Sequence, residues 1–283
     1  MKRRGIMQLH FTKMEGIGND YIYFDGINQE IPMDKEFIMK ISDRHFGIGS
    51  DGMIVILPSD QYDFKMRMFN LDGSEAMMCG NGIRCFAKFI YDHKLSDKHV
   101  LKIETKSGLR TVELLFDGDE CIGAKVNMGK PVLTCQDIPC TYAKEKMIDE
   151  PVEIGGREYR LTTISMGNPH TVTFVSDLDT LDLKTIGPKF EHHQLFPASV
   201  NTEFVQIINK SYVKMRVWER GSGETMACGT GACAVMYACY LNHYTDSKVT
   251  VELLGGCLEI EYVDETIMMS GPAANVFNGT IEI

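Results

Sequence analysis

The chain has 283 residues, 44% of them hydrophobic, which is compatible with two packed domains. Lysine and arginine total 29 against 39 aspartates and glutamates, and this net charge of −10 argues against a nucleic-acid-binding surface. The longest apolar run, residues 232–241, is too short to span a membrane, and residues 5–13 lack the apolar core of a signal peptide. We therefore expect a cytoplasmic protein with neither nucleic-acid nor membrane partners.

The first half of the chain reads as strands interrupted by two helices. The segment 15–20 is a glycine turn, and Asp34 is the expected N-cap of a helix that ends near residue 44. A second, amphipathic helix is predicted over residues 80–93. Strands are predicted over residues 8–14, 21–25, 53–57, 62–69, 99–105, 109–116 and 121–127.

The second half repeats this order after a weakly patterned stretch, residues 128–150, where Gly129-Lys130-Pro131 is a plausible domain crossing. A helix is predicted over residues 181–190, and another follows Cys228 to about residue 242. That last helix is apolar on every side, so we expect a sheet to wrap it. Strands are predicted over residues 157–163, 171–175, 204–208, 212–218, 248–253, 257–263, 266–270 and 276–283.

The stretch that begins at Lys214 aligns without a gap on residues 65–86 when the sequence is shifted by 149 positions (228 − 79 = 149). The shift also places Asn19 on Asn168 and Gly52 on Asn201. We infer an internal duplication, with a first domain over residues 1–127, to which the strand 274–283 returns, and a second over 128–273. The residues that meet their own type under this shift are Lys65, Met66, Arg67, Glu75, Met77, Cys79, Gly80 and Gly82.

The nine cysteines are few for a disulfide scaffold and odd in number, so we expect reduced thiols. Their spacing does not match the Cys-x-x-Cys pattern of a zinc site, and we predict no metal. Core packing suits four of them, since free cysteine is commonly buried. These four are Cys85, Cys233, Cys239 and Cys257.

Cys79 and Cys228 are different, because each precedes a Gly-x-Gly sequence that opens a helix. The unpaired N–H groups and the dipole at a helix start favour a thiolate and attract anions. If the duplicated halves face one another, two helix starts can hold one carboxylate while two thiols act on opposite sides of the adjacent carbon, which is inversion by two bases. The sequence shows neither a pyridoxal lysine motif nor a nucleotide loop, so we expect no organic cofactor.

Nearly the whole chain resembles the diaminopimelate epimerase family. The resemblance implies a pyridoxal-independent enzyme that interconverts LL- and meso-diaminopimelate for lysine and peptidoglycan synthesis. It also implies an α/β (α+β) fold of two pseudo-symmetric domains, each a mixed, mainly antiparallel sheet around a buried helix, and commonly a homodimer. The motifs that carry it are MEGIGND at 14–20, DRHFGIG at 43–49, FNLDGS at 69–74, CGNGIRC at 79–85, MGNPH at 166–170, ERGSGET at 219–225 and CGTG at 228–231.

The same resemblance assigns roles to individual positions. Cys79 and Cys228 would be the acid/base pair, and His170 and Glu219 would tune their pKa values. Backbone N–H groups would hold the reacting carboxylate at Gly80, Asn81, Gly229 and Thr230. Side chains would grip the substrate, including its distal amino-acid head, at Asn19, Asn70, Asn168, Asn201, Glu219 and Arg220.

Asn19 and Asn168 also suit ordinary glycine turns, His170 an ordinary strand and Arg220 a solvated surface. Two departures from the family pattern are Gly52, where many members have glutamine and a substrate contact would be lost, and six residues before Met7, an alternative start. Two rival functions stay open. One is a proline or hydroxyproline racemase of the same fold, and the other is a non-catalytic amino-acid-binding protein in which Cys79 and Cys228 form a redox-switch disulfide.

Overall fold

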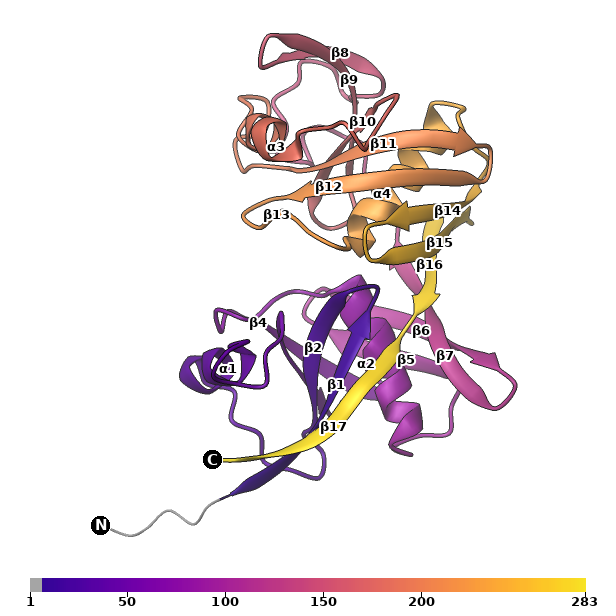
Figure 1. Ribbon diagram of the computed structural model, residues 1–283. Coiled ribbons are helices and arrows are strands. Elements are labelled where there is room, and N and C mark those ends of the chain that lie inside the picture. Colours follow the sequence, from indigo (N-terminus) through magenta and orange to yellow (C-terminus); the bar gives the residue numbers. More distant parts are fainter. Residues whose placement is uncertain (1–6) are drawn as a thin grey trace. The chain divides into compact units, whose positions relative to one another are not determined.

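Each half of the chain builds a sheet around one helix that begins at a cysteine (Figure 1). The computed structural model describes residues 7–283, so the question of the start before Met7 lies outside the described residues. One compact unit contains the chain up to Val126 together with Gly271–Ile283, and the other contains Asn127–Ser270. Among residues 7–283, no helix is long and apolar enough to cross a membrane.

The first unit contains α1 (Lys35–Ser42) and the central helix α2 (Gly80–Asp92). Its strands pair in the order β17, β1, β2, β3, β4, β5, β6, β7, antiparallel except that β2–β3 and β4–β5 are parallel. These strands are β1 (Gln8–Gly16), β2 (Asn19–Asp25), β3 (Gly52–Leu57), β4 (Phe64–Asn70), β5 (Val100–Thr105), β6 (Gly108–Asp117), β7 (Glu120–Gly129) and β17 (Ala274–Glu282).

The second unit contains α3 (Leu183–Glu191) and the central helix α4 (Gly229–Leu241). Its strands pair in the order β8, β9, β10, β11, β12, β14, β15, β16, and again only β10–β11 and β12–β14 are parallel. These strands, with the short β13 beside the end of β12, are β8 (Glu150–Ile154), β9 (Arg157–Ser165), β10 (Pro169–Phe174), β11 (Asn201–Asn209), β12 (Tyr212–Glu219), β13 (Gly223–Glu224), β14 (Lys248–Leu253), β15 (Gly256–Val263) and β16 (Thr266–Pro272). The two units therefore share one topology, as a duplication requires.

The loop that leads to each cysteine is braced by the same ion pair. Arg67 Nε donates to Glu75 Oε1 at 2.8 Å in the first unit, and Arg216 Nε donates to Glu224 Oε1 at 2.7 Å in the second. Both pairs are only partly exposed, so solvent weakens them less than a surface pair. Arg216 and Glu224 each lie 149 positions after their equivalents, Arg67 and Glu75. The duplication has therefore kept this ion pair as well as the cysteine.

Both central helices are buried along almost their whole length. This confirms the prediction for α4 but corrects the amphipathic reading of α2, because Arg84 and Lys88 are also buried. The Arg84 side chain donates to the carbonyl oxygen of Pro272 at 3.1 Å, and Lys88 Nζ donates to the carbonyl oxygen of Cys121 at 2.6 Å. Backbone acceptors from the surrounding strands thus compensate these buried cations.

Most element boundaries agree with the sequence pattern. The predicted N-cap Asp34 accepts a hydrogen bond from the Phe37 N–H at 3.0 Å, and α3 continues through Pro188. The short strands β8 and β13 were not predicted. The prediction for Cys257 was wrong, because this residue is exposed on β15, whereas Cys85, Cys233 and Cys239 are buried in the central helices.

Gly52 is a glycine for backbone reasons. Its φ is +156°, and a Cβ placed on it would lie 2.0 Å from the carbonyl oxygen of Phe69 on the neighbouring strand. No side chain fits this position without a shift of the sheet.

We predict that Gly52→Ala lowers the free energy of unfolding by about 3 kcal/mol, because it combines an unfavourable φ with a backbone clash. The matched control is Gly118→Ala, whose φ is +58° and whose Cβ would have nothing within 4 Å. That control should cost only about 1 kcal/mol. Urea unfolding of both variants measures the difference, and equal losses would show that the clash with Phe69 is relieved at no cost.

Candidate active site

In both units a cysteine sulfur caps the central helix. Cys79 Sγ accepts a hydrogen bond from the Gly82 N–H at 3.4 Å, and Cys228 Sγ accepts one from the Gly231 N–H at 3.3 Å. This is the bond that a serine or aspartate N-cap normally accepts. Each thiol is therefore fixed beside the N–H groups of the first helical turn, which have no partner within the helix.

The first half-site, Cys79 with Asn19 and Asp51, lies at the start of α2. The Cys79 thiol donates to Asn19 Oδ1 at 3.2 Å, and Asn19 Nδ2 donates to Asp51 Oδ2 at 2.7 Å. Asp51 fixes the amide in this way, and Arg44 in turn binds Asp51 at 2.9 Å. Asn19 thus presents its oxygen, an acceptor, to a partly exposed thiol.

The other residues predicted for this half-site lie in two different settings. Asn70 ends β4 and donates to Ser74 Oγ at 3.1 Å, within the turn that leads to the cysteine. Asn81 is buried in the first turn of α2, where its Oδ1 accepts from Arg84 Nη1 at 3.0 Å. The Asn81 side chain is thereby engaged inside the unit, and only its backbone N–H suits an anion at the helix start.

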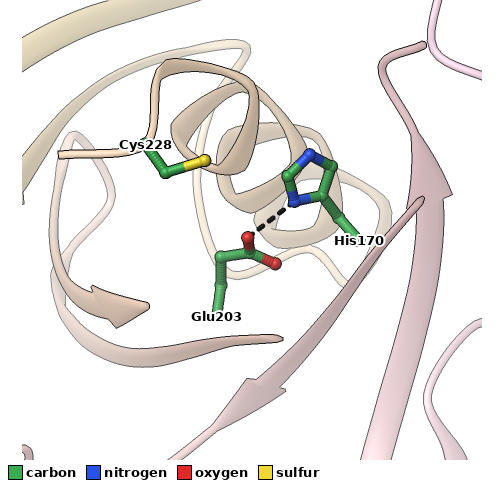
Figure 2. Close-up of side chains that lie close together, drawn as sticks. All are labelled: His170, Glu203 and Cys228. Atoms are coloured by element: carbon green, nitrogen blue, oxygen red, sulfur yellow. Dashed lines mark hydrogen bonds and ion pairs between the residues drawn. The ribbon is translucent and has the colours of Figure 1, made fainter. Parts of the chain in front are cut away.

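The second half-site, Cys228 with His170, Glu203 and Asn168, is buried and more polar. Figure 2 shows Cys228, His170 and Glu203 converging at the start of α4. Nδ1 of His170 and Oε1 of Glu203 lie 2.6 Å apart, and both side chains are fully buried. On the other side of the ring, His170 Nε2 lies 3.0 Å from Asn168 Oδ1.

Glu203 was not predicted from the sequence. It lies in the buried first part of β11, between Thr202 and Phe204. Burying a carboxylate costs free energy unless it is paired. An acid among strand residues expected to be buried was therefore the sequence signal that could have indicated a functional residue. Possible metal-ligand atoms of His170, Glu203 and Cys228 lie within 4.8 Å of one another, which is close enough to bind one ion. A cation would, however, have to break the His170–Glu203 pair.

Three further predicted residues lie around the end of β12. Asn201 is buried, donates to the carbonyl oxygen of Pro169 at 2.9 Å and accepts from the Arg220 N–H at 2.9 Å. Glu219 accepts a hydrogen bond from the Thr225 hydroxyl, and burial raises the pKa of this carboxyl group. Arg220 is exposed, with its guanidinium donating to the carbonyl oxygen of Ala198 at 3.1 Å. Asn201 thus fixes the backbone from which Arg220 projects.

Burial raises the pKa of the Cys228 thiol well above its usual range, and the nearby carboxylates of Glu219 and Glu203 raise it further. Hydrogen bonds from the Thr230 hydroxyl and the Gly231 N–H act in the opposite direction but are outweighed. This corrects the expectation that the helix start favours a thiolate at Cys228. The direction of this shift favours the neutral thiol form of Cys228.

The fold of the chain is shared with solved structures of low sequence identity. A Bacillus anthracis protein of the PhzF phenazine-biosynthesis family is 17% identical with a TM-score of 0.67, and covers 98% of this chain and 100% of its own. A hydroxyproline epimerase from Agrobacterium vitis is 12% identical with a TM-score of 0.67, at 97% and 91% coverage. These likenesses confirm the predicted fold class.

Sequence similarity is more specific. The family model for diaminopimelate epimerase matches residues 11–134 and 162–276. A diaminopimelate epimerase from Methanococcus maripaludis is 53% identical over 277 residues, covering 97% of this chain and 100% of its own length. One from Acetivibrio thermocellus is 50% identical over 277 residues, at 97% and 99% coverage. The chain belongs to the diaminopimelate epimerase family, whose members are isomerases.

We predict that Glu219→Gln lowers the pH at which Cys228 becomes reactive, because the carboxylate of Glu219 disfavours the neighbouring thiolate. The measurement is the rate of iodoacetamide labelling at Cys228 against pH, followed by peptide mass spectrometry to separate it from the other cysteines. Glu153→Gln, on the exposed face of β8, is the matched control and should leave the profile unchanged. A rise in the midpoint for Glu219→Gln would contradict the electrostatic account.

Proposed function

We propose that this protein interconverts LL- and meso-2,6-diaminopimelate without an organic cofactor, with Cys79 and Cys228 as the two acid/base residues. The observation that carries the proposal is the duplicated cap, in which each unit holds a thiol at the start of its central helix. The substrate is taken from the name shared by relatives that are 46–53% identical over nearly their full length. Its product would serve lysine and peptidoglycan precursor synthesis.

The reaction needs one thiolate and one thiol. A thiolate removes the α-hydrogen as a proton, and the electron pair of the broken C–H bond is delocalised into the adjacent carboxylate. The opposite thiol then gives its proton to the other face of the carbon, which inverts it and exchanges the roles of the two sulfurs. The raised pKa of Cys228 supports its starting as the donor with Cys79 as the base in one direction, and the reverse reaction starts from the other state.

The carboxylate next to the reacting carbon gains negative charge during proton removal. Backbone N–H groups at a helix start stabilise such charge at little cost, because they are already oriented. We assign this role to the first turns of α2 and α4. The backbone donors are those of Gly80, Asn81, Gly229 and Thr230.

We assign recognition of the distal amino-acid head to side chains at the ends of strands. Arg220 offers a guanidinium for a carboxylate and Glu219 a carboxylate for an ammonium, a combination that reads a zwitterion. Asn19, Asn70, Asn168 and Asn201 complete the proposed set. A substrate with a single amino-acid group, such as proline, would leave Arg220 without a carboxylate to bind, so the racemase alternative is less well supported. The redox-switch alternative does not account for the similarity of the chain to the diaminopimelate epimerase family.

We further propose that the protein is a homodimer of the cytoplasm. The resemblance to the family supports the dimer. The nine cysteines, few for a disulfide scaffold and odd in number, support a reducing compartment. Size-exclusion chromatography with light scattering measures the oligomeric state directly.

We predict that Cys79→Ala and Cys228→Ala each lower epimerisation by about a thousandfold or more, since each removes one of two required proton carriers. The assay follows conversion of LL-diaminopimelate to the meso isomer by reduced protein without added cofactor. Cys257→Ala removes an exposed cysteine of the same chain and should retain full activity. Substantial turnover in either of the first two variants would contradict two-thiol catalysis.

A further inference from the structure

Glu191, the last residue of α3, is bonded to the turn that carries Glu219 and Arg220. Its side chain is buried, and each of its carboxylate oxygens accepts one hydrogen bond. The Gly221 N–H donates to Oε1 at 2.8 Å, and the Trp218 indole N–H donates to Oε2 at 2.7 Å. Because a backbone N–H and an indole N–H can only donate, the direction of both bonds is unambiguous.

The stability of α3 does not explain an acid at this position. A negative charge at the C-terminal end of a helix is unfavourable with the helix dipole, and a buried carboxylate costs free energy unless it is hydrogen-bonded. Helix α3 lies beside β12 and β13 (Figure 1). Glu191 therefore joins α3 to the turn between these two strands, and its two bonds offset the cost of its burial.

The first unit builds the equivalent helix and turn without this anchor. By the shift of 149 residues, Ser42 takes the place of Glu191, and Phe69 takes the place of Trp218. The Ser42 hydroxyl is buried and has no hydrogen-bond partner among residues 7–283, and a phenyl ring has no N–H. The first turn is held from within, where the Asp72 carboxylate accepts from a backbone N–H two residues ahead at 2.9 Å. The topology of a unit therefore does not require the anchor.

The contact between α3 and Trp218 is also specific to the second unit. A Cβ on Gly187 would lie 2.2 Å from Cδ2 of the indole, so this glycine makes room for the ring against the helix. The equivalent residue of α1 is Ile38. Gly187 and Trp218 are thus a complementary small and large pair, which places the indole N–H beside the carboxylate.

Two consecutive backbone N–H groups of the second turn are bound by side chains from outside it. Asn201 Oδ1 accepts from the Arg220 N–H at 2.9 Å, and Glu191 accepts from the Gly221 N–H. These N–H groups belong to the peptide groups before and after Arg220. Because both peptide planes are held, the direction in which the Arg220 side chain leaves the backbone is fixed as well.

The anchored turn is also the one that carries charge. Glu219 and Arg220 occupy the positions that Asn70 and Leu71 have in the first unit. A carboxylate and a guanidinium held on one short turn can bind the ammonium and the carboxylate of an amino-acid group. The second unit thus differs from the first both in the ligand-binding side chains and in the buried acid that holds their backbone.

We propose that Glu191 is a positioning residue for the distal amino-acid head of the substrate. It fixes the peptide group that follows Arg220, so that Arg220 and Glu219 are ordered before the substrate binds. The identity of this ligand rests on the proposed function, but the anchoring of the turn does not. Without Glu191 the turn has to be ordered during binding, which weakens the affinity for the substrate.

Three variants separate the bond to the turn from the bond to the indole. Glu191→Met removes both acceptors at nearly constant volume, and Trp218→Phe removes only the indole donor. Glu191→Gln combined with Trp218→Phe restores an acceptor for the Gly221 N–H, and the glutamine NH₂ group then faces no second donor. Comparison of the three variants assigns the effect of Glu191 to one bond or the other.

The first readout compares KM for LL-diaminopimelate with kcat. We expect Glu191→Met to raise KM about tenfold with a smaller change in kcat, because the distal head takes no part in proton transfer. Trp218→Phe and the double variant should have a KM within about threefold of the parent value. If the methionine variant does not fold, Glu191→Ser combined with Trp218→Phe, which copies the two residues of the first unit, takes its place with the same expected rise.

The second readout needs no activity. Hydrogen exchange followed by NMR measures the protection of the Gly221 N–H in each variant. We expect this N–H to exchange about tenfold faster than in the parent in Glu191→Met, and at nearly the parent rate in Trp218→Phe and in the double variant. Trp218 is the only tryptophan of the chain, so its single indole N–H signal reports the other bond.

Faster exchange and a raised KM in Glu191→Met, both reversed in the double variant, support the proposal. An unchanged KM, a fall in kcat as large as the rise in KM, or unchanged exchange at Gly221 would overturn it. A Trp218→Phe variant or a double variant that behaves like Glu191→Met would also overturn it, since the effect would then come from the indole contact. If the protein does not turn over diaminopimelate at all, the proposed function fails while the exchange result still tests the anchor.

Discussion

The sulfur-capped helix start is the interaction on which the rest of the structure depends. A thiol that accepts a hydrogen bond from the N–H three residues ahead is held at the start of the central helix, where the first backbone N–H groups have no partner within the helix. The third residue of each cap is a glycine against which another side chain packs closely. A Cβ on Gly231 would lie 2.6 Å from Glu203 Oε1, and one on Gly82 would lie 2.8 Å from the Ile54 side chain.

The duplication keeps the scaffold and changes what surrounds each sulfur. Both loops carry the same arginine–glutamate brace, and both sheets have the same parallel and antiparallel pairs. Cys79 is partly exposed beside an amide oxygen, whereas Cys228 is buried beside two carboxyl groups. The two cysteines therefore have the same scaffold but different electrostatic surroundings.

The sequence pattern predicted the features that depend on residues close together in the chain. The Asp34 cap, the burial of the all-apolar α4 and the helix starts at both cysteines follow from neighbouring residues. Other features depend on residues distant in sequence. The burial of Arg84 requires the carbonyl oxygen of Pro272, and the φ of Gly52 is set by the strand that carries Phe69. The hydrophobic periodicity of one segment does not show which distant residues it will contact in the fold.

The candidate site shows the same division. Motif similarity selects the cysteines and the asparagines as candidates but not Glu203, because a single acid in a strand is usually a solvent-facing residue. Only the fold shows that it is fully buried against His170. The pKa of Cys228 was likewise misjudged, since a helix start alone favours a thiolate, whereas burial and two carboxyl groups have the larger effect.

The most direct test of two thiols acting on opposite sides of one carbon is deuterium incorporation at early conversion. LL-diaminopimelate is incubated with reduced protein in deuterated water and sampled below about a tenth of equilibrium, when little product has reverted. Two-base inversion predicts deuterium at the inverted carbon of the meso product and almost none in the recovered substrate. Deuterium appearing in recovered substrate as fast as in product would show that one base serves both faces, and would contradict the account.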